Sequence, residues 1–340
     1  KLCPSTVGIH IFCRYSRHMH DSVAAKNSKT VLITGASGVV GRHLRKHAAQ
    51  HNWNVRALTT SIGSKRDDDT TQWVGWNPEL AANGDVGAIE TIAEALSGAM
   101  AVINLAGSAV DAGRIGPKHR QRILKSRLDA SEALAAALRT TNDAPALWIQ
   151  ASGVGYYGDT GEKEVTEQEP LGTGLHLSDI CRQWEAAGLE AEPSIRRVVT
   201  RIGLVMASDA DAYKKMMQPI RMGVGGRLGN GKQWYPWIAG QDIARAFFHL
   251  IEMETTENVY NFTAPEPVRQ FEMTQLLAKA INRPSFFPAP NFVLKAVLGG
   301  VASELLLPSC RALPTNLLAS GFQFRYRSFA DLVPDLMQGE

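Results

Sequence analysis

The sequence predicts an α/β protein: a doubly wound parallel sheet with helices on both faces, followed by a small, mostly helical C-terminal domain. Three observations predict this fold. Short apolar, β-branched runs alternate with helical spacing from residue 30 to about residue 264, a glycine-rich turn joins the first run to the first helix, and the alternation ends after Pro265. At about 150 residues per domain, the 340 residues correspond to roughly two structural units.

Each apolar run that fits a strand is followed by a segment whose apolar residues recur at helical spacing. The first elements are a strand at 30–34, a helix at 39–50 and a strand at 54–59. Later strands are expected at 101–105, 146–151, 197–206 and 258–263, and later helices at 89–96, 117–139, 177–191 and 241–252. This alternation predicts parallel pairing, because parallel neighbours need a long crossover, usually a helix.

The chain beyond Pro265 has a different pattern. Two helical stretches, 271–281 and 291–306, flank a proline-rich segment, and a last short strand is predicted at 321–326, where aromatic and polar residues alternate. We therefore divide the chain into a basic arm (1–28), a sheet domain (29–264) with an inserted loop (207–238), and a small C-terminal domain (265–340).

Composition excludes several classes of protein. With 44% hydrophobic and 20% charged residues, the chain is globular rather than disordered. A net charge of +3 is too small to predict nucleic acid or an anionic membrane as partner, so such a partner would need a local cluster of charge. The chain contains no run of about 18 uncharged apolar residues, so no transmembrane helix is predicted. The four cysteines form no C-x-x-C pair, and neither a disulfide framework nor a metal site is predicted.

The basic arm contains Lys1, Arg14, Arg17 and Lys26 and only one acid, Asp21. A basic leader with few acids is typical of organelle import, so we expect an organellar protein, mitochondrial rather than plastid, and otherwise a cytoplasmic one. Two other interpretations stay open. The arm could be an extension without structure, or it could pack on its own domain or on a protein partner in a multi-subunit assembly.

The strongest motif is T-G-A-S-G-V-V-G, residues 34–41, which follows the first strand and opens the first helix. Gly35 allows a tight turn, Gly38 lets the backbone approach a pyrophosphate, and Gly41 permits close packing of the helix. The helix N-terminus adds unpaired N–H groups and a partial positive charge. This order predicts a Rossmann-type domain that binds a dinucleotide; the alternative is a degenerate pocket that binds none.

The end of the second strand indicates which dinucleotide is bound. An enzyme that uses NAD places Asp or Glu there to accept from the ribose 2′-hydroxyl, whereas this chain has Thr59 and Thr60. No carboxylate would repel a 2′-phosphate at that place, and Arg42, Lys65 and Arg66 lie in adjoining segments. We therefore predict NADP(H), although the three aspartates that follow Arg66 could neutralise the loop cations.

From about residue 29 to residue 336 the chain resembles the atypical extended short-chain dehydrogenase/reductases that are labelled epimerase family or nucleotide-sugar epimerase-like proteins. Besides the glycine turn, the resemblance rests on W-N-P at 76–78, N-L-A-G at 104–107, S-R at 126–127, A-S-G-V-G-Y-Y-G at 151–158, W-E at 184–185, G-V-G-G-R-L-G-N-G-K-Q-W-Y-P-W-I at 223–238, N-F-T-A-P at 261–265 and G-F at 321–322. It implies an NADP-binding Rossmann domain, a small C-terminal domain over the substrate cleft, and an undefined substrate.

The resemblance also implies positions in the site. Leu105, Ala106 and Gly107 would line the adenine and ribose side of the cofactor, and Ser152 would lie beside the nicotinamide. The full set of residues predicted to bind the cofactor is Gly35, Ser37, Gly38, Val39, Val40, Gly41, Arg42, Thr59, Thr60, Leu105, Ala106, Gly107, Arg127 and Ser152.

The catalytic residues of ordinary reductases are missing. Those enzymes protonate the substrate oxygen with a tyrosine whose pKa, ordinarily about 10, is lowered by a lysine four residues later. None of the seven tyrosines has a lysine at that spacing. In the corresponding helix the pair is Cys181 and Glu185, and Gly153 stands where the catalytic serine is expected, with Ser152 one residue out of register.

Four residues are candidates for catalysis: Tyr157 as acid, Glu185 as acid or base, Cys181 as a thiol near the nicotinamide, and Ser152. The first three have structural alternatives. Tyr157 could only pack and hydrogen-bond at a strand end, Glu185 could pair with Arg182 on its own helix, and Cys181 could be a small buried apolar residue.

A glycine-rich segment later in the chain has a misleading spacing. G-R-L-G-N-G-K at 226–232 matches a P-loop, but Gln233 stands where magnesium binding requires Ser or Thr, and no clear helix follows. We exclude an ATPase site. The glycines predict instead a loop at the mouth of the substrate cleft, with Trp234 and Trp237 as apolar walls, or else a surface connector.

Two functions follow from these features. The first is an NADP(H)-dependent oxidoreductase or epimerase with unusual acid–base residues. The second is an NADP(H)-binding protein without catalysis, recruited as a structural or accessory subunit of a larger organellar assembly such as a respiratory complex. A fold alone does not decide between them.

Overall fold

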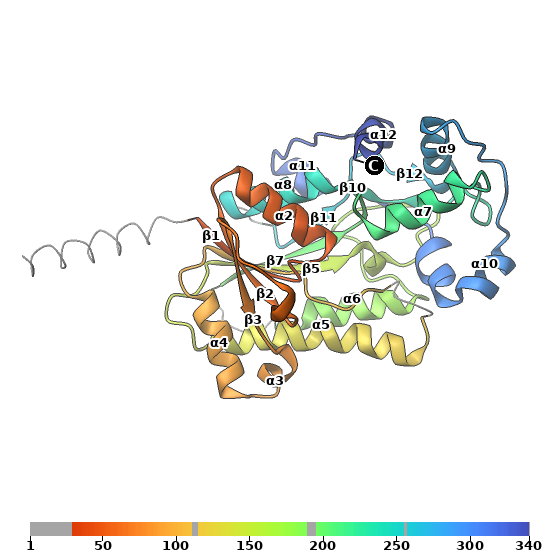
Figure 1. Cartoon of the computed structure of the whole chain (residues 1–340). Coiled ribbons are helices and arrows are strands. Elements are labelled where there is room, and N and C mark those ends of the chain that lie inside the picture. Colours follow the sequence, from red (N-terminus) through yellow and green to blue (C-terminus); the bar gives the residue numbers. More distant parts are fainter. Residues whose placement is uncertain (1–28, 111–114, 189–194, 255–256, 340) are drawn as a thin grey trace, which may run out of the picture.

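The structure is a computed structural model that describes residues 29–110, 115–188, 195–254 and 257–339. Its centre is a sheet of seven parallel strands (Figure 1). Across the sheet the strands are β11 (Val259–Phe262), β7 (Arg196–Ile202), β5 (Leu147–Gly153), β4 (Ala101–Asn104), β1 (Thr30–Thr34), β2 (Asn54–Thr59) and β3 (Thr71–Gly75). The order reverses at β1, which confirms the predicted doubly wound, Rossmann-type fold. The predicted arm, with Cys3 and Cys13, lies outside the described residues.

Helices cover both faces of the sheet, as Figure 1 shows. One layer contains α2 (Val39–Gln50) and α8 (Gly240–Glu252), and the other contains α4 (Val86–Leu96), α5 (Pro117–Leu138) and α6 (His176–Ala186). The short α3 (Pro78–Ala82) packs against α5. Within the described ranges, no helix is long and apolar enough to cross a bilayer.

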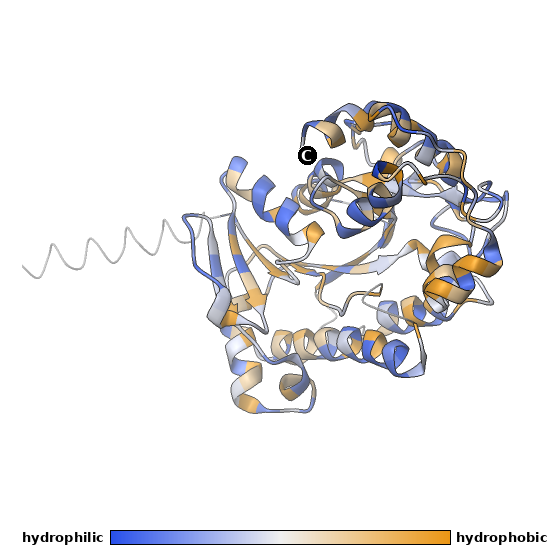
Figure 2. Ribbon diagram, turned by 45° about the vertical axis from the view of Figure 1, so that its right-hand side comes forward, coloured by the Kyte–Doolittle hydropathy of each residue, from blue (hydrophilic) through white to orange (hydrophobic). Residues whose placement is uncertain are grey.

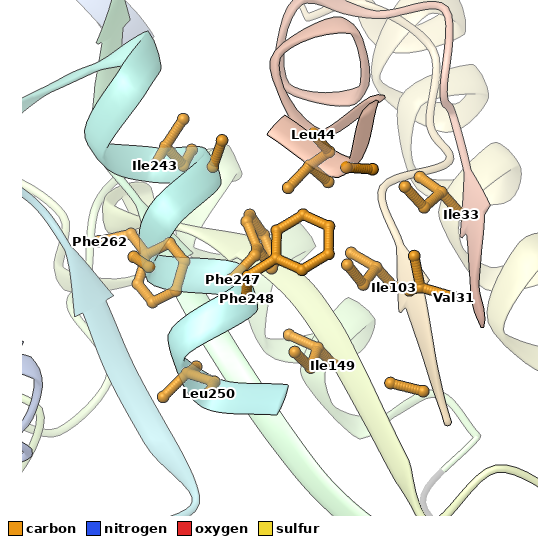
Figure 3. Close-up of a cluster of buried hydrophobic side chains, with 14 of the residues drawn as sticks. Val31, Ile33, Leu44, Ile103, Ile149, Ile243, Phe247, Phe248, Leu250 and Phe262 are labelled. Atoms are coloured by element: carbon orange, nitrogen blue, oxygen red, sulfur yellow. The ribbon is translucent and has the colours of Figure 1, made fainter. Parts of the chain in front are cut away.

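The core beneath α8 fixes the half of the sheet that carries the glycine turn. Ile243, Phe247 and Leu250 recur at helical spacing and are fully buried (Figure 3). The ring of Phe247 lies 4.9 Å from that of Phe262 on β11. Leu44 of α2 is buried in the same cluster. Each such side chain stabilises the fold by about 1.5–3 kcal/mol, so the carboxyl ends of the strands are held rigidly.

A second core joins the inserted segment to the C-terminal helices. It contains residues of α7 (Asp211–Arg221), α9 (Gln270–Ala280) and α12 (Phe329–Gln338). The remaining helices are α10 (Asn291–Leu298), a π-helical turn (Ala302–Leu306), α11 (Thr315–Ala319) and two 3-10 turns (Ile62–Ser64 and Val154–Tyr157). Three two-stranded pairs complete the fold: β8 (Leu204–Met206) with β10 (Trp237–Ala239), β9 (Trp234–Tyr235) with β12 (Val268–Arg269), and β6 (Glu164–Val165) with β13 (Arg311–Ala312).

The structure differs from the sequence prediction at several elements. The short α3, α11, β6, β9, β12 and β13 and the last helix, α12, were not predicted, and the strand expected at 197–206 is divided into β7 and β8. Strand β3 was not predicted, because it is a five-residue edge strand and only half-buried. Helix α7 was not predicted within the inserted loop, since Pro219 lies inside it. The predicted helix at 291–306 breaks at Gly299, whose φ is 56°. The predicted strand at 321–326 is wrong: that segment is irregular, although its aromatic side chains are the more buried ones.

Candidate cofactor and active site

The glycine turn after β1 has the shape of a phosphate cradle. Gly35 has a φ of 66°, and a Cβ there would lie 2.7 Å from the carbonyl oxygen of Leu105. A Cβ on Gly41 would lie 2.5 Å from the Cα of Ala36. Larger residues at either position would therefore push the turn away from its neighbours. Gly38, by contrast, is exposed and has only the Gly35 oxygen near its Cβ position, so this face is open to a ligand.

Helix α2 presents its N-terminus to that open face. Gly38 is the N-cap and supplies no side chain to cap the first turn, and no acidic residue lies in that turn. The first N–H groups of the helix, on Val39, Val40 and Gly41, therefore point towards the cradle with the partial positive charge of the helix dipole. Ser37 beside them is exposed. A pyrophosphate fits these donors without competition from the protein's own side chains.

Arg42 lies at the same turn but already has partners. Its Nε donates to Asp209 Oδ2 at 2.8 Å, and its Nη1 donates to the Ser37 carbonyl at 3.0 Å. Burial raises the pKa of Asp209, but hydrogen bonds from Arg42 and His43 outweigh burial, and the pKa stays below its ordinary value. Asp209 thus neutralises much of the charge that Arg42 would offer to a 2′-phosphate.

The end of β2 carries two threonines with different surroundings. Thr59 is buried and accepts from the Ser61 N–H, whereas Thr60 is exposed. Lys65 lies 4.8 Å over the ring of Trp73. The first two aspartates after Arg66 accept hydrogen bonds from backbone N–H groups at the start of β3.

The segment after β4 is pinned close to the glycine turn. The N–H groups of Leu105 and Ala106 both donate to Thr34 Oγ1, at 3.1 and 3.0 Å. Thr34 in turn donates to Asn104 Oδ1, and Asn104 donates to Gln150 on β5. This buried network ties the ends of β1, β4 and β5 together, so the predicted adenine-side residues lie next to the cradle.

Arg127 on α5 packs against the segment after β4, at Gly107 and Ser108. A Cβ on Gly107 would lie 2.9 Å from its guanidinium, which donates to the carbonyls of Ser108 and Ile123 and stacks 4.6 Å over the ring of Trp184. Among the described residues no carboxylate forms an ion pair with Arg127. Burial lowers the pKa of Arg127 to about 10. A partly buried cation without an acidic partner among the described residues suits an anionic ligand, so the glycine cradle, the helix N-terminus and Arg127 together fit a dinucleotide.

A buried polar network brings together three of the four catalytic candidates, Ser152, Glu185 and Tyr157. Ser152 Oγ donates to Glu185 Oε1 at 2.7 Å. Arg201 on β7 donates two hydrogen bonds to the same carboxylate, from Nε to Oε1 and from Nη2 to Oε2, each at 3.0 Å. The side chains of Arg201 and Glu185 are only 5% and 13% exposed. Glu185 therefore pairs with Arg201 rather than with Arg182, which was the structural alternative considered from the sequence.

Tyr157 belongs to the same network, which we call the relay: Ser152, Glu185, Arg201, Tyr157 and Asn261. The Tyr157 hydroxyl donates to Asn261 Oδ1 at 2.7 Å and accepts from Arg201 Nη1 at 3.0 Å. Burial raises the pKa of Tyr157 to about 12, against the opposing effect of Arg201. The phenol is therefore a hydrogen-bonded neutral group near neutral pH.

Cys181 lies beside the relay, where its thiol is within hydrogen-bond reach of the Ser152 side chain and of the Gly153 backbone. It is 7% exposed, and its Sγ lies 3.8 Å from the position that a Cβ on Gly153 would take. Burial, followed by the nearby charge of Glu185, raises the pKa of this thiol. A thiol held neutral is a poor nucleophile.

The two tryptophans predicted to wall the substrate cleft have different places. Trp237 is fully buried, and its ring packs 5.2 Å from that of Phe329 in the second core, so its assignment to a cleft wall was wrong. Trp234 is partly exposed and lies between the guanidinium groups of Arg269 and Arg311. The segment 223–231 has no P-loop helix after it and continues into β9.

Sequence reasoning missed Arg201, the residue that joins three of the four catalytic candidates. A signal was present, because Arg201 follows Val198, Val199 and Thr200 within a predicted strand, and a cation buried in a strand needs a partner. The partner itself could not be read from the sequence, since Glu185 lies on a different element.

Comparison with known proteins agrees with this geometry. The model of the NAD dependent epimerase/dehydratase family matches residues 31–262, and a domain of unknown function, DUF1731, matches residues 289–335. A chloroplastic homolog of epimerase family protein SDR39U1 from Arabidopsis thaliana is 33% identical, covering 92% of this chain and 88% of that protein. An epimerase family protein from Mycobacterium leprae is also 33% identical, covering 90% and 95%.

A solved structure extends the similarity. Human epimerase family protein SDR39U1, isoform 2, crystallised with NADPH, matches with a TM-score of 0.80 and 28% identity, covering 92% of this chain and all of that one. The predicted resemblance to atypical short-chain dehydrogenase/reductases is confirmed.

Proposed function

Because this chain belongs to the NAD dependent epimerase/dehydratase family, we propose that it is an NADP(H)-dependent oxidoreductase or epimerase that works without a tyrosine–lysine pair. The observation that carries the proposal is the hydrogen bond from Ser152 to Glu185 at the carboxyl end of β5. In doubly wound folds, ligands bind at this edge of the sheet. A hydroxyl paired with a carboxylate is a proton pathway, which redox chemistry at a C–O bond requires.

The relay supplies the proton transfer. When bound, the nicotinamide accepts or supplies the hydride. In the oxidising direction, a substrate hydroxyl next to Ser152 passes its proton to Ser152 Oγ as the serine proton moves to Glu185. In the reducing direction, the same proton returns to the carbonyl oxygen. Arg201 holds the carboxylate in place through two hydrogen bonds, so Glu185 needs no reorganisation.

Tyr157 and Cys181 are weaker candidates for the proton donor. A general acid works best when its pKa lies near the operating pH, whereas burial raises the pKa of Tyr157 to about 12. The Tyr157 hydroxyl is also engaged by Arg201 and Asn261. We therefore assign Tyr157 to positioning of Arg201 and Cys181 to packing.

NADP(H) is proposed as the cofactor rather than NAD(H). The end of β2 carries no carboxylate from residue 58 to residue 61 that would repel a 2′-phosphate. The similar human protein is described with NADPH. Because Asp209 already neutralises Arg42, we assign the 2′-phosphate chiefly to the exposed segment that begins at Thr60.

The test is NADPH oxidation by the full chain with a panel of aldehydes, α-dicarbonyl compounds and UDP-hexoses, followed at 340 nm. We expect turnover that falls about 10²–10⁴-fold in Glu185→Gln and in Ser152→Ala, with NADPH affinity unchanged. Tyr157→Phe should lose far less activity. Glu94→Gln, the same change at an exposed residue of α4, is the matched control.

The pH profile separates a catalytic from a merely structural role. If Glu185 carries the proton, the pH dependence of kcat/KM differs between the wild type and the residual activity of Glu185→Gln. Equal turnover in wild type and Glu185→Gln would contradict the proposal. A melting temperature and an NADPH titration for each variant distinguish loss of chemistry from loss of fold.

A second candidate function is supported by the completeness of the relay's hydrogen bonds. Tyr157 and Glu185 already have partners, and Cys181 is buried, as in a protein that binds NADP(H) without turnover. Such a protein could be an accessory subunit of a larger organellar complex, stabilised by its nucleotide. Tight NADPH binding with no oxidation by any member of the panel would favour it.

We also propose limits for the two domains and a location for the protein in the cell. We propose a cofactor domain at 29–264 and a smaller domain at 265–340, which the family matches at 31–262 and 289–335 support. The chloroplastic Arabidopsis relative supports an organellar location and favours plastid, whereas nothing in the comparisons supports the predicted preference for mitochondrion. Imaging of the full chain with a C-terminal fluorescent tag tests this location.

A further inference from the structure

Helix α10 is apolar on both of its faces. Leu294 is buried against the protein, whereas Phe292, Val293 and Val297 on the other side are 74%, 38% and 65% exposed. A helix that is hydrophobic all round is normally covered on every side. In Figure 2 this helix is the strongly hydrophobic one at the right-hand end of the molecule. The fold itself therefore leaves the outward face of α10 without an apolar partner among the described residues.

The exposed apolar surface continues from α10 onto two neighbouring loops. The loop after α7 lies along the segment before α10, since the Ala289 N–H donates to the Arg227 carbonyl at 2.7 Å and the Gly229 N–H donates to the Ala289 carbonyl at 2.8 Å. These loops carry Met222 and Phe286, which are 70% and 68% exposed. We call this surface the apolar end; its exposed apolar residues are Met222, Val224, Phe286, Phe287, Phe292, Val293 and Val297.

The same segments are strongly basic. Residues 214–232 contain five Lys or Arg and no acid, and residues 279–307 contain three Lys or Arg and one acid. That acid, Glu304, is buried and accepts from the Leu177 N–H at 3.1 Å, so it adds little negative charge to the surface. Arg227, Arg283 and Lys295 are exposed beside the apolar residues. Although the whole chain has a net charge of only +3, this end is locally cationic.

We propose that the apolar end docks the protein on an anionic phospholipid bilayer. Aromatic and aliphatic side chains that protrude beside Lys and Arg combine burial at the headgroup boundary with attraction to anionic lipid. A second copy of the chain would bring the same cations together, and the basic arm would also be repelled. A protruding helix with large exposed side chains suits a deformable lipid surface better than a preformed groove in a protein.

The test is flotation of the full chain with vesicles. We compare pure phosphatidylcholine with phosphatidylcholine that contains about 30% phosphatidylserine, at about 0.1 M and about 1 M salt. We expect binding to the anionic vesicles at low salt, with a partition coefficient at least about tenfold above that for neutral vesicles, and strong weakening at high salt, where the screening length is about 3 Å.

Two variants test the two halves of the surface separately. Phe292→Glu with Val297→Glu should abolish binding, because two carboxylates would enter the bilayer boundary. Arg283→Gln with Lys295→Gln should lower the partition coefficient about 25-fold, since each cation near an anionic surface contributes about 1 kcal/mol, or about fivefold. Val86→Glu, at a 66% exposed valine of α4, is the matched control and should bind as the wild type does.

The outcomes are decisive in either direction. Absence of binding to the anionic vesicles, or equal binding by wild type and Phe292→Glu/Val297→Glu, would overturn the proposal. A third result would also overturn it: light scattering shows a dimer for the wild type and a monomer only for Phe292→Glu/Val297→Glu. The apolar end would then be a contact between two copies of the chain. Melting temperature and NADPH affinity, which the variants should leave unchanged, guard against misfolding. The inference does not depend on the proposed catalytic function.

Discussion

The two ends of the proposed cofactor site are built in opposite ways. At the glycine turn, the backbone forms the site. The glycines carry no side chains that would fill it, and no side chain caps the first N–H groups of helix α2. At the relay, side chains from β5, α6, β7 and β11 satisfy one another in a buried network. The glycine turn leaves its backbone donors open to a ligand, whereas the side chains of the relay already bond to one another. The proposed cofactor site therefore relies on the backbone, whereas the proposed proton transfer relies on side chains.

The largest expected effect comes from breaking the relay at its centre. Arg201→Met leaves Glu185 as a buried charge without its cation, and we expect the free energy of unfolding to fall by about 3–5 kcal/mol. The double variant Glu185→Leu/Arg201→Met should lose less than this single change. Urea denaturation measures both.

A matched arginine makes this result specific. Arg182→Met, at an exposed arginine whose nearest acid is 3.9 Å away, should cost less than about 0.5 kcal/mol. If Arg201→Met costs no more than Arg182→Met, the relay does not stabilise the fold as described.

The next effect tests the cradle. Gly35→Ala places a Cβ 2.7 Å from the Leu105 oxygen on a backbone with a φ of 66°. We expect a loss of about 2–4 kcal/mol in unfolding free energy and at least about 100-fold in NADPH affinity. Gly161→Ala is the control, because Gly161 has a φ of 58° with open space around it. We expect Gly161→Ala to lower the free energy of unfolding by about 1 kcal/mol, through backbone strain alone, and to leave NADPH affinity unchanged. Equal effects of both variants on NADPH affinity would refute the cradle.

A smaller effect is expected at the end of β2. Thr60→Asp would place a carboxylate near the proposed 2′-phosphate and should weaken NADPH binding about tenfold, or about 1.4 kcal/mol, while NADH binding stays the same or improves. Ser97→Asp, at another exposed position, is the control. Isothermal titration measures both affinities, and an unchanged ratio of NADPH to NADH affinity would place the 2′-phosphate elsewhere.

The smallest effect concerns Tyr157. At neutral pH, Tyr157→Phe should lower the free energy of unfolding by about 1 kcal/mol, because Asn261 and Arg201 each lose a buried hydrogen-bond partner. Burial raises the pKa of Tyr157 to about 12 in the folded protein, above its ordinary value of about 10. The stability from the neutral phenol is therefore complete below about pH 10 and is lost as pH rises towards 12. The difference between wild type and variant should shrink over that range, and a constant difference would show that the phenol is not buried.

The contrast between the two ends also explains what the sequence could predict. Gly35, Gly38 and Gly41 act through the local backbone, so their spacing sufficed to predict the turn, and β1, α2 and β2 have the predicted limits. Arg201, Asn261 and Glu185 act through contacts between distant elements, which a single sequence does not reveal. Trp237 was misplaced for the same reason, because its burial depends on Phe329 in the last helix.

The most direct test of the cofactor site is a titration of the full chain with NADPH and with NADH, followed by energy transfer from tryptophan to the nicotinamide. NADPH should bind at least about tenfold more tightly than NADH, a difference of about 1.4 kcal/mol. Equal affinity for the two, or binding of neither, would contradict a site built around the backbone donors of α2 and a ribose that carries a 2′-phosphate.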